Sequence, residues 1–393
     1  ILAAFYKYKA LPKVKTELPS PVSPQKSSPI VTAAMVILCA WALARIAFVL
    51  FESTTVPIYS TDAVSTWTSG AKFFFYERGL GLDLGPGEFF GKNYRLFMGH
   101  PIFISLLQMW TSLWVGEFSE VCVKISGFAF FISLLAVFFL AVKRETTLNS
   151  AVVWVFFLTS APLIVYHGGD SLSDLPLSYY SLSAVVLLWR FIKNANPRLL
   201  MLAGFMLGIG IFVKNEGLLF TFGIAVALIL FLKQKKRAIL KPFVSFIVPF
   251  IIMAAPWFLF KIFNDLGFGH SGQDSGMVWF SDPRFSADAE TSIHWEIIPI
   301  AVKELFLSAN FNLIFSFWAV LTVFKFKSVA RTDIKYLYVV TLLVMAVFVF
   351  VYLTLEVTAV TESSGFHRNM LTYLPIIFFT SAVLLAREKK KEP

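Results

Sequence analysis

The chain has 393 residues, of which 57% are hydrophobic and only 15% are charged. A chain this apolar cannot cover itself with polar surface, which excludes a soluble globular domain and predicts that lipid solvates much of it. The formal net charge of +10 would suit a nucleic-acid-binding protein, but the basic residues lie in short clusters between apolar stretches. Such clusters are typical of topology signals and of contacts with anionic lipid, so we expect the lipid bilayer, and no nucleic acid, as a partner.

The N-terminal 29 residues are expected to form a tail. From Lys7 to Pro29 the sequence is rich in lysine, proline and serine, a composition that cannot bury an apolar core. We therefore predict a disordered cytoplasmic tail at 1–29, a single transmembrane domain at 30–386 and a basic cytoplasmic tail at 387–393.

Ten apolar runs follow the tail, each close to the ~20 residues that a helix needs to cross the hydrocarbon core. They predict an all-α polytopic membrane protein with about ten transmembrane helices. The runs cover residues 30–51, 121–142, 150–168, 174–190, 199–214, 217–232, 242–262, 308–324, 336–355 and 369–386. An eleventh run, 101–116, is ambiguous by hydropathy alone.

Charge segregation decides whether 101–116 crosses, because each added crossing moves all later loops to the other side. If this run does not cross, 23 Lys and Arg share one side with five acidic residues, and the other side holds ten basic and 19 acidic residues. Cytoplasmic loops are the ones enriched in Lys and Arg. We therefore expect both termini in the cytoplasm, a plasma-membrane location if the organism is prokaryotic, and 101–116 lying along the outer surface or dipping back.

The first outer loop, 52–120, contains a predicted surface helix. Apolar residues recur there every four positions, at Ala63, Trp67, Ala71 and Phe75. This spacing is typical of an amphipathic helix at the membrane interface. Asp62 stands at its start, where a carboxylate either caps the helix and is stabilised by its dipole, or acts as a functional group at the outer surface.

Two further acids, Asp170 and Asp174, fall where one predicted span ends and the next begins. If this segment is helical, their spacing of four places both carboxylates on one face. Acids at the edge of an apolar helix are costly unless they meet a cation, a metal or a substrate hydroxyl. The alternative is that they only cap the helix.

Charged residues also mark two later outer connections. Lys214 and Glu216 interrupt a long apolar stretch, and ionisable groups at such depth indicate a functional site, unless they only close a helical hairpin. Arg368 precedes the final span, where a guanidinium either binds a phosphate or anchors the helix at the interface. Between these connections, the polar and Gly-rich outer loop 263–307 is a predicted lid.

No Walker loop, GxSxG motif or dinucleotide fingerprint occurs in the sequence. Its five histidines all fall on the predicted outer side, yet no two have the spacing of metal ligands along a helix. No cofactor is therefore predicted, and a divalent cation stays an open alternative.

In their order along the chain, these features resemble the polytopic C-type glycosyltransferases (GT-C), the superfamily of protein O-mannosyltransferases, aminoarabinose transferases and oligosaccharyltransferases. The shared features are an acid in the first outer loop, a His-Pro, a second acidic motif, a Lys- and Gly-containing turn, and a basic residue before a late Leu-Pro. In this sequence they are Asp62, His100-Pro101, Asp170 with Asp174, Lys214 to Gly217, and Arg368 with Leu374-Pro375.

The resemblance implies transfer of a sugar from a polyprenyl-phosphate donor to an acceptor, which is a lipid, a glycan or a protein, on the outer or lumenal face. It implies that Asp62 is the general base. The other implied contacts are Asp170, Asp174, His100 and Glu216 for acceptor or sugar, and Lys214 and Arg368 for the phosphate.

Two other functions fit parts of the sequence, namely a transporter or flippase and a catalytically inactive structural subunit. Transporters carry ionisable residues near the bilayer midplane and often have repeated halves. Here the charges cluster at the outer boundary and no repeat relates 30–214 to 217–386, which favours the transferase. Asp62-Ala63 stands where the superfamily often has Asp-Glu, which leaves the inactive subunit open.

Overall fold

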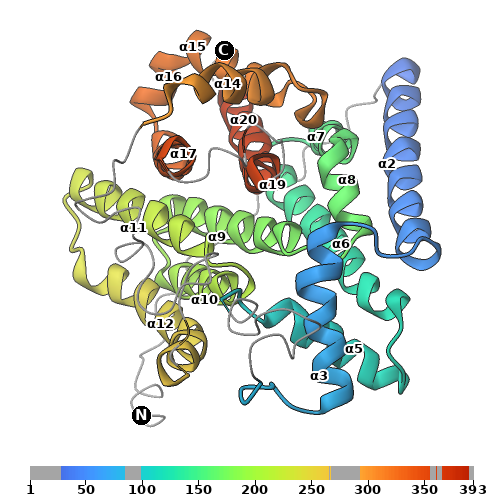
Figure 1. Cartoon of the computed structure of the whole chain (residues 1–393). Coiled ribbons are helices and arrows are strands. Elements are labelled where there is room, and N and C mark those ends of the chain that lie inside the picture. The colour runs from blue at the N-terminus through green and yellow to red at the C-terminus, as the bar shows by residue number, and fades with distance from the viewer. Residues whose placement is uncertain are drawn as a thin grey trace, which may run out of the picture.

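The computed structural model describes residues 28–84, 99–264, 266, 293–354, 360 and 365–388. Within these ranges the chain forms helices and their connections, with no β-strand (Figure 1). Nearly all of the predicted N-terminal tail, most of the predicted lid 263–307 and the last five residues lie outside the described residues.

Within the described residues, seven helical segments are long and apolar enough to cross a membrane. They are α2 (Pro29–Thr55), α6 (Glu120–Glu145), α9 (Asp174–Asn194), α11 (Gly217–Gln234), α12 (Leu240–Phe263), α17 (Lys335–Thr354) and the joined pair α19 (Gly365–Leu371) and α20 (Leu374–Glu388). This set confirms an all-α, multi-pass integral membrane protein.

The other three predicted spans differ from straight, full-length helices. Residues 150–168 form α7 (Leu148–Ser160) and α8 (Pro162–Gly169), which meet at 70° because proline has no N–H for the helix ladder. Residues 199–214 form α10 (Pro197–Val213), 17 residues long. Only the end of 308–324 is α15 (Ile314–Phe324), since η4 (Ala309–Phe311) and two left-handed residues, Asn312 and Leu313, precede it.

The most buried helices lie in the middle of the bundle. In α9 and in the α19–α20 pair, 78% and 83% of the apolar window is buried, whereas α2 buries 6% and stands at the edge (Figure 1). Helices α10 and α12 approach closely because α10 presents glycines there. A Cβ on Gly204 would lie 2.0 Å from the carbonyl oxygen of Phe246, so only glycine fits this contact.

The first outer loop contains η1 (Ala63–Thr68), α3 (Ser69–Glu77) and α5 (Phe103–Val115). The four apolar residues spaced by four are all buried, so the predicted amphipathic face is confirmed. In helix α5 polar residues face the protein and aromatic residues face outward, since Ser105 and Gln108 are buried while Trp110 and Trp114 are exposed. Its 13 residues span about 20 Å, too short for a hydrocarbon core of about 30 Å.

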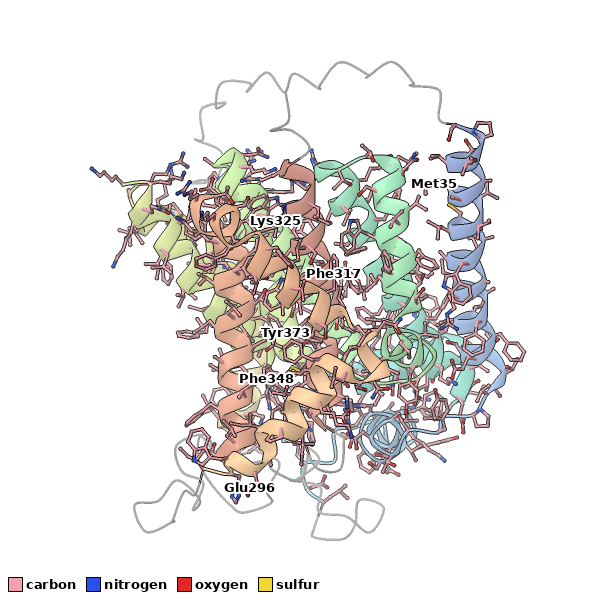
Figure 2. The ribbon with its side chains drawn as sticks, turned by 90° about the horizontal axis from the view of Figure 1, so that it is seen from above. Met35, Glu296, Phe317, Lys325, Phe348 and Tyr373 are labelled. Atoms are coloured by element: carbon pink, nitrogen blue, oxygen red, sulfur yellow. The ribbon has the colours of Figure 1, made fainter. Side chains whose placement is uncertain are left out.

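The two ends of the bundle match the predicted sides. In Figure 2, Met35 in α2 and Lys325 after α15 lie toward one end, and Glu296 in η3 (Trp295–Ile297), which leads into α14 (Ile298–Leu307), lies at the opposite end. A short helix, α16 (Phe326–Arg331), follows Lys325. Which end faces the cytoplasm stays a prediction from the charge count.

Candidate active site

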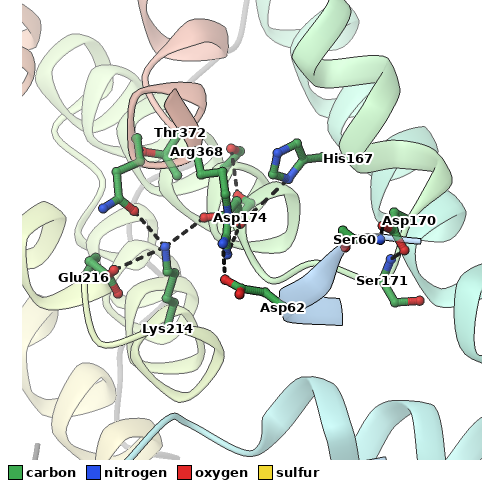
Figure 3. A network of polar contacts seen from close by, with 12 residues as sticks. Ser60, Asp62, His167, Asp170, Ser171, Asp174, Lys214, Glu216, Arg368 and Thr372 are labelled. Carbon is green, nitrogen blue, oxygen red and sulfur yellow. Dashed lines mark hydrogen bonds and ion pairs between the residues drawn. The ribbon is translucent and has the colours of Figure 1, made fainter. Parts of the chain in front are cut away.

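A fully buried carboxylate, that of Asp174, lies at the centre of a polar network at the start of α9 (Figure 3). Its Oδ2 is 3.1 Å from both Nε and Nη2 of Arg368, and its Oδ1 is 2.7 Å from Nζ of Lys214. The helix dipole favours an anion in this first turn. Two cations, rather than the backbone N–H groups of a cap, therefore neutralise Asp174.

Arg368 joins a second carboxylate to the first. Its Nη1 donates a hydrogen bond to Oδ2 of Asp62, while the rest of the guanidinium faces Asp174. Asp62 precedes η1 but makes no side-chain capping hydrogen bond, so the capping alternative is wrong. Its side chain is 49% exposed, against 0% for Asp174. The network is therefore open to solvent at the Asp62 end and closed at the Asp174 end.

Lys214 fills the third side of the network, just after α10 ends. Besides Asp174, its Nζ contacts Oδ1 of Asn369 at 2.7 Å and Oε1 of Glu216 at 3.2 Å. These three partners match the three N–H donors of an ammonium group. Asn369 donates in turn to the hydroxyl of Tyr352 at 2.6 Å. The Lys214–Glu216 pair therefore closes the α10–α11 turn and also belongs to the network.

Three carboxylates, those of Asp62, Asp174 and Glu216, contact the two cations Lys214 and Arg368 in this network. His167 of α8 borders it, with Nδ1 3.7 Å from Oδ2 of Asp174. That ring is buried, and neither nitrogen has a hydrogen-bond partner within the described residues. His167 therefore adjoins Asp174 without forming a hydrogen bond to it.

Asp170 does not join this network. Its buried carboxylate accepts hydrogen bonds from the backbone N–H of Ser60 at 3.2 Å and of Ser171 at 2.7 Å (Figure 3). The condition under which Asp170 and Asp174 would share a helix face is not met, because Asp170 has an extended backbone and α9 begins only at Asp174.

His100 lies near the site but outside the bonds that hold Asp174. Its ring packs edge-on against Trp67 of η1, with ring centroids 5.7 Å apart. The carbonyl of the preceding Gly99 accepts from Nζ of Lys261 at 2.8 Å and from Asn215 at 3.4 Å. The backbone just before His100 is therefore hydrogen-bonded to the turn that contains Lys214 and to Lys261 of α12.

Several partners were not identified from the sequence. Asn369 contacts Lys214, and Tyr352 in turn accepts a hydrogen bond from Asn369. His367 shares a 2.7 Å hydrogen bond with Glu304 of α14. Tyr352 lies inside an apolar run, where nothing local distinguishes it from other core aromatics. Asn369 and His367 flank Arg368, so their position beside a predicted site residue was the available signal.

No group of three or more metal-ligating side chains forms within the part of the chain that the structure describes. Asp62 and Asp174 instead both face a guanidinium. A divalent cation stays an open alternative for this site.

The comparisons with known proteins support the resemblance to the polytopic C-type glycosyltransferases that the sequence shows. A family model described as dolichyl-phosphate-mannose-protein mannosyltransferase matches residues 99–260, less than half of the chain. That range includes His100, Asp174 and Lys214. No curated protein matches the sequence.

Two solved structures share this fold. The crystal structure of ArnT from Cupriavidus metallidurans bound to undecaprenyl phosphate matches with a TM-score of 0.59 and 13% sequence identity, over 91% of this chain and 60% of that chain. The apo form of the same protein matches with a TM-score of 0.57 and 13% identity, over 92% and 62%. The chain therefore spans about three-fifths of the length of these structures.

Proposed function

We propose that this chain is a membrane glycosyltransferase that moves a sugar from a polyprenyl-phosphate donor to an acceptor on the outer or lumenal face. One observation carries the proposal: Arg368 joins the half-exposed Asp62 to the buried Asp174, at the ends of helices that the charge count places outside. A carboxylate beside an arginine supplies a base for the acceptor and a cation for a departing phosphate.

The proposed donor is supported by the similar proteins. One solved structure with this fold is ArnT bound to undecaprenyl phosphate, and the matching family model is described by dolichyl phosphate mannose. Both descriptions name a polyprenyl phosphate. The long apolar helices of this chain lie in a bilayer, and lipid next to the site can solvate such a prenyl chain.

The proposed reaction begins when the donor phosphate takes a hydrogen-bonding place on Arg368 and displaces Asp62. The freed carboxylate accepts the proton of the acceptor hydroxyl as its oxygen bonds to the anomeric carbon. The bond between that carbon and the phosphate oxygen breaks, and its electron pair leaves with the polyprenyl phosphate. Arg368 and Lys214 stabilise the negative charge that collects on this phosphate.

The remaining side chains have supporting roles in this proposal. Asp174 keeps Arg368 and Lys214 charged and in place, and its position also allows contact with a sugar hydroxyl. Glu216 and His100 contact acceptor or sugar from the two sides of the site, where the Lys214 turn and the loop before α5 lie.

Sugar transfer by the purified chain is the direct test. The protein in nanodiscs is supplied with a panel of radiolabelled polyprenyl-phosphate sugars and a crude membrane extract as acceptor. We expect label transfer by the wild type, and a loss on the order of 100-fold or more in Asp62→Asn with folding unchanged. Glu77→Gln is the matched control, since Glu77 is an exposed carboxylate on the neighbouring α3.

Two results would redirect the assignment. No transfer with any donor would favour an inactive subunit or a transporter, and uptake of the labelled lipid into sealed vesicles separates these two. An Asp62→Asn variant as active as wild type would remove Asp62 as the base while leaving the glycosyltransferase class intact.

A further inference from the structure

We propose that Glu120, Lys124 and Asp170 form a backbone clamp that positions Asp62 for the reaction. The inference rests on the proposed function, because it assigns these residues a role in presenting the proposed base. The clamp acts on residues 56–60, which connect α2 to the helix that Asp62 precedes and have no regular secondary structure.

Two clamp residues come from the first turns of α6. Nζ of Lys124 donates to the carbonyl oxygens of Glu52 and Val56, both at 2.9 Å. Oε2 of Glu120 accepts from the backbone N–H of Ile58 at 2.9 Å. Residues four apart share one face of a helix, so α6 holds both a carbonyl and an N–H of the connection. Lys124 is fully buried, and leaving such a charge without these acceptors would be costly.

Asp170 holds the other end of the connection. One carboxylate oxygen accepts from the N–H of Ser60, two residues before Asp62, and the other accepts from the N–H of Ser171. Both oxygens are therefore occupied by backbone donors, and the side chain is fully buried. These contacts favour a positioning role for Asp170 over the contact with acceptor hydroxyls that the sequence suggested.

Tyr59, within the connection, makes two further contacts that hold it in place. Its hydroxyl donates to Oε1 of Glu52 at 2.7 Å, and its ring packs edge-on against Tyr166, with centroids 5.4 Å apart. Burial and the bond to Glu52 raise the pKa of the Tyr59 phenol well above its usual range. Tyr59 therefore stays protonated at neutral pH and keeps its hydrogen bond to Glu52.

The clamp matters because it holds the backbone that leads into the first turn of the helix where Asp62 stands. Its side chain is 49% exposed and makes no capping bond, and its partner Arg368 is the group that the donor phosphate must engage. Once that bond is exchanged, the position of the carboxylate depends on the backbone at the start of this helix, which residues 56–60 anchor. A misplaced base loses rate even though its chemistry is intact.

Conservative and disruptive variants separate positioning from substrate binding. Asp170→Asn places an NH2 group opposite a backbone N–H, so we expect kcat to fall on the order of 100-fold with KM for the donor little changed. Glu120→Ala is expected to lower kcat, whereas Glu120→Gln keeps a carbonyl acceptor for Ile58 and is expected to retain most of it. Because the clamp acts through Asp62, Asp62→Asn with Asp170→Asn should be no slower than Asp62→Asn alone.

A second measurement tests the clamp without any activity. Amide hydrogen exchange at Ile58 and Ser60 should be slow in the wild type, fast in Glu120→Ala and slow again in Glu120→Gln, with exchange in α9 unchanged. Fast exchange at these amides in the wild type would refute the clamp, as would a rise in KM alone in Asp170→Asn. If the wild type transfers no sugar, the proposed function fails. The exchange measurement still tests whether the clamp holds residues 56–60.

Discussion

Removing the Asp174 carboxylate should destabilise the fold as well as the site. Asp174→Asn keeps the shape of the side chain but leaves Arg368 and Lys214 facing a neutral group in a buried place. Breaking a buried ion pair by removing one partner costs about 3–5 kcal/mol. Because two cations lose this partner, we expect a loss near 5 kcal/mol, a large share of the ~5–15 kcal/mol that usually stabilises a folded protein.

Unfolding of the purified protein in detergent micelles, followed by denaturant titration and by Tm, measures this loss. Asp333→Asn is the control, since Asp333 lies 3.2 Å from Lys235 with the two side chains 32% and 43% exposed, and a solvent-accessible pair contributes below about 1 kcal/mol. Adding Lys214→Met to Asp174→Asn removes one of the two cations that lost Asp174 and should recover part of the stability. Equal stability of Asp174→Asn and Asp333→Asn would refute the electrostatic reasoning.

Three further predictions concern packing, the site and the membrane surface. Gly204→Ala should lower the free energy of unfolding by about 1–3 kcal/mol, because its Cβ would clash with the backbone of α12. The control Gly210→Ala should be neutral or stabilising by up to about 1 kcal/mol, because its Cβ would lie 3.5 Å from its nearest neighbour. Arg368→Lys should slow sugar transfer on the order of 100-fold, because an ammonium cannot bridge both carboxylates; a variant above a tenth of the wild-type rate would contradict this. Brominated lipids should quench the fluorescence of Trp114, which is 76% exposed, so Trp114→Phe should reduce the quenching while Trp189→Phe, at a fully buried position, should not.

Hydropathy was enough to predict the helical membrane architecture, because it is a local property of the chain. A run of apolar residues must cross or bury itself wherever it lies, and the stripe from Ala63 to Phe75 faces the protein as its four-residue spacing requires. Local breaks were harder to predict. Pro162 bends one predicted span by 70°, and the left-handed residues Asn312 and Leu313 delay the start of another.

The candidate site was only partly predictable. Asp62, Asp174, Lys214 and Arg368 stood out because ionisable residues beside apolar runs are costly without a partner. Their partners could not be assigned, since Asp62 and Arg368 lie 306 positions apart. Nothing local distinguished Asp170 from Asp174 either, although one carboxylate contacts two cations and the other two backbone N–H groups.

By itself, the sequence determined that this is an all-α membrane protein and that its unusual charges gather at one predicted face. Those conclusions depend on composition and periodicity, which do not change with how the helices pack. The tertiary structure alone decided which charges meet, that Arg368 joins Asp62 to Asp174, and that Asp170 turns to the backbone of Ser60. Each contact joins distant segments, and helix packing fixes it because a buried charge must find a partner within hydrogen-bond reach.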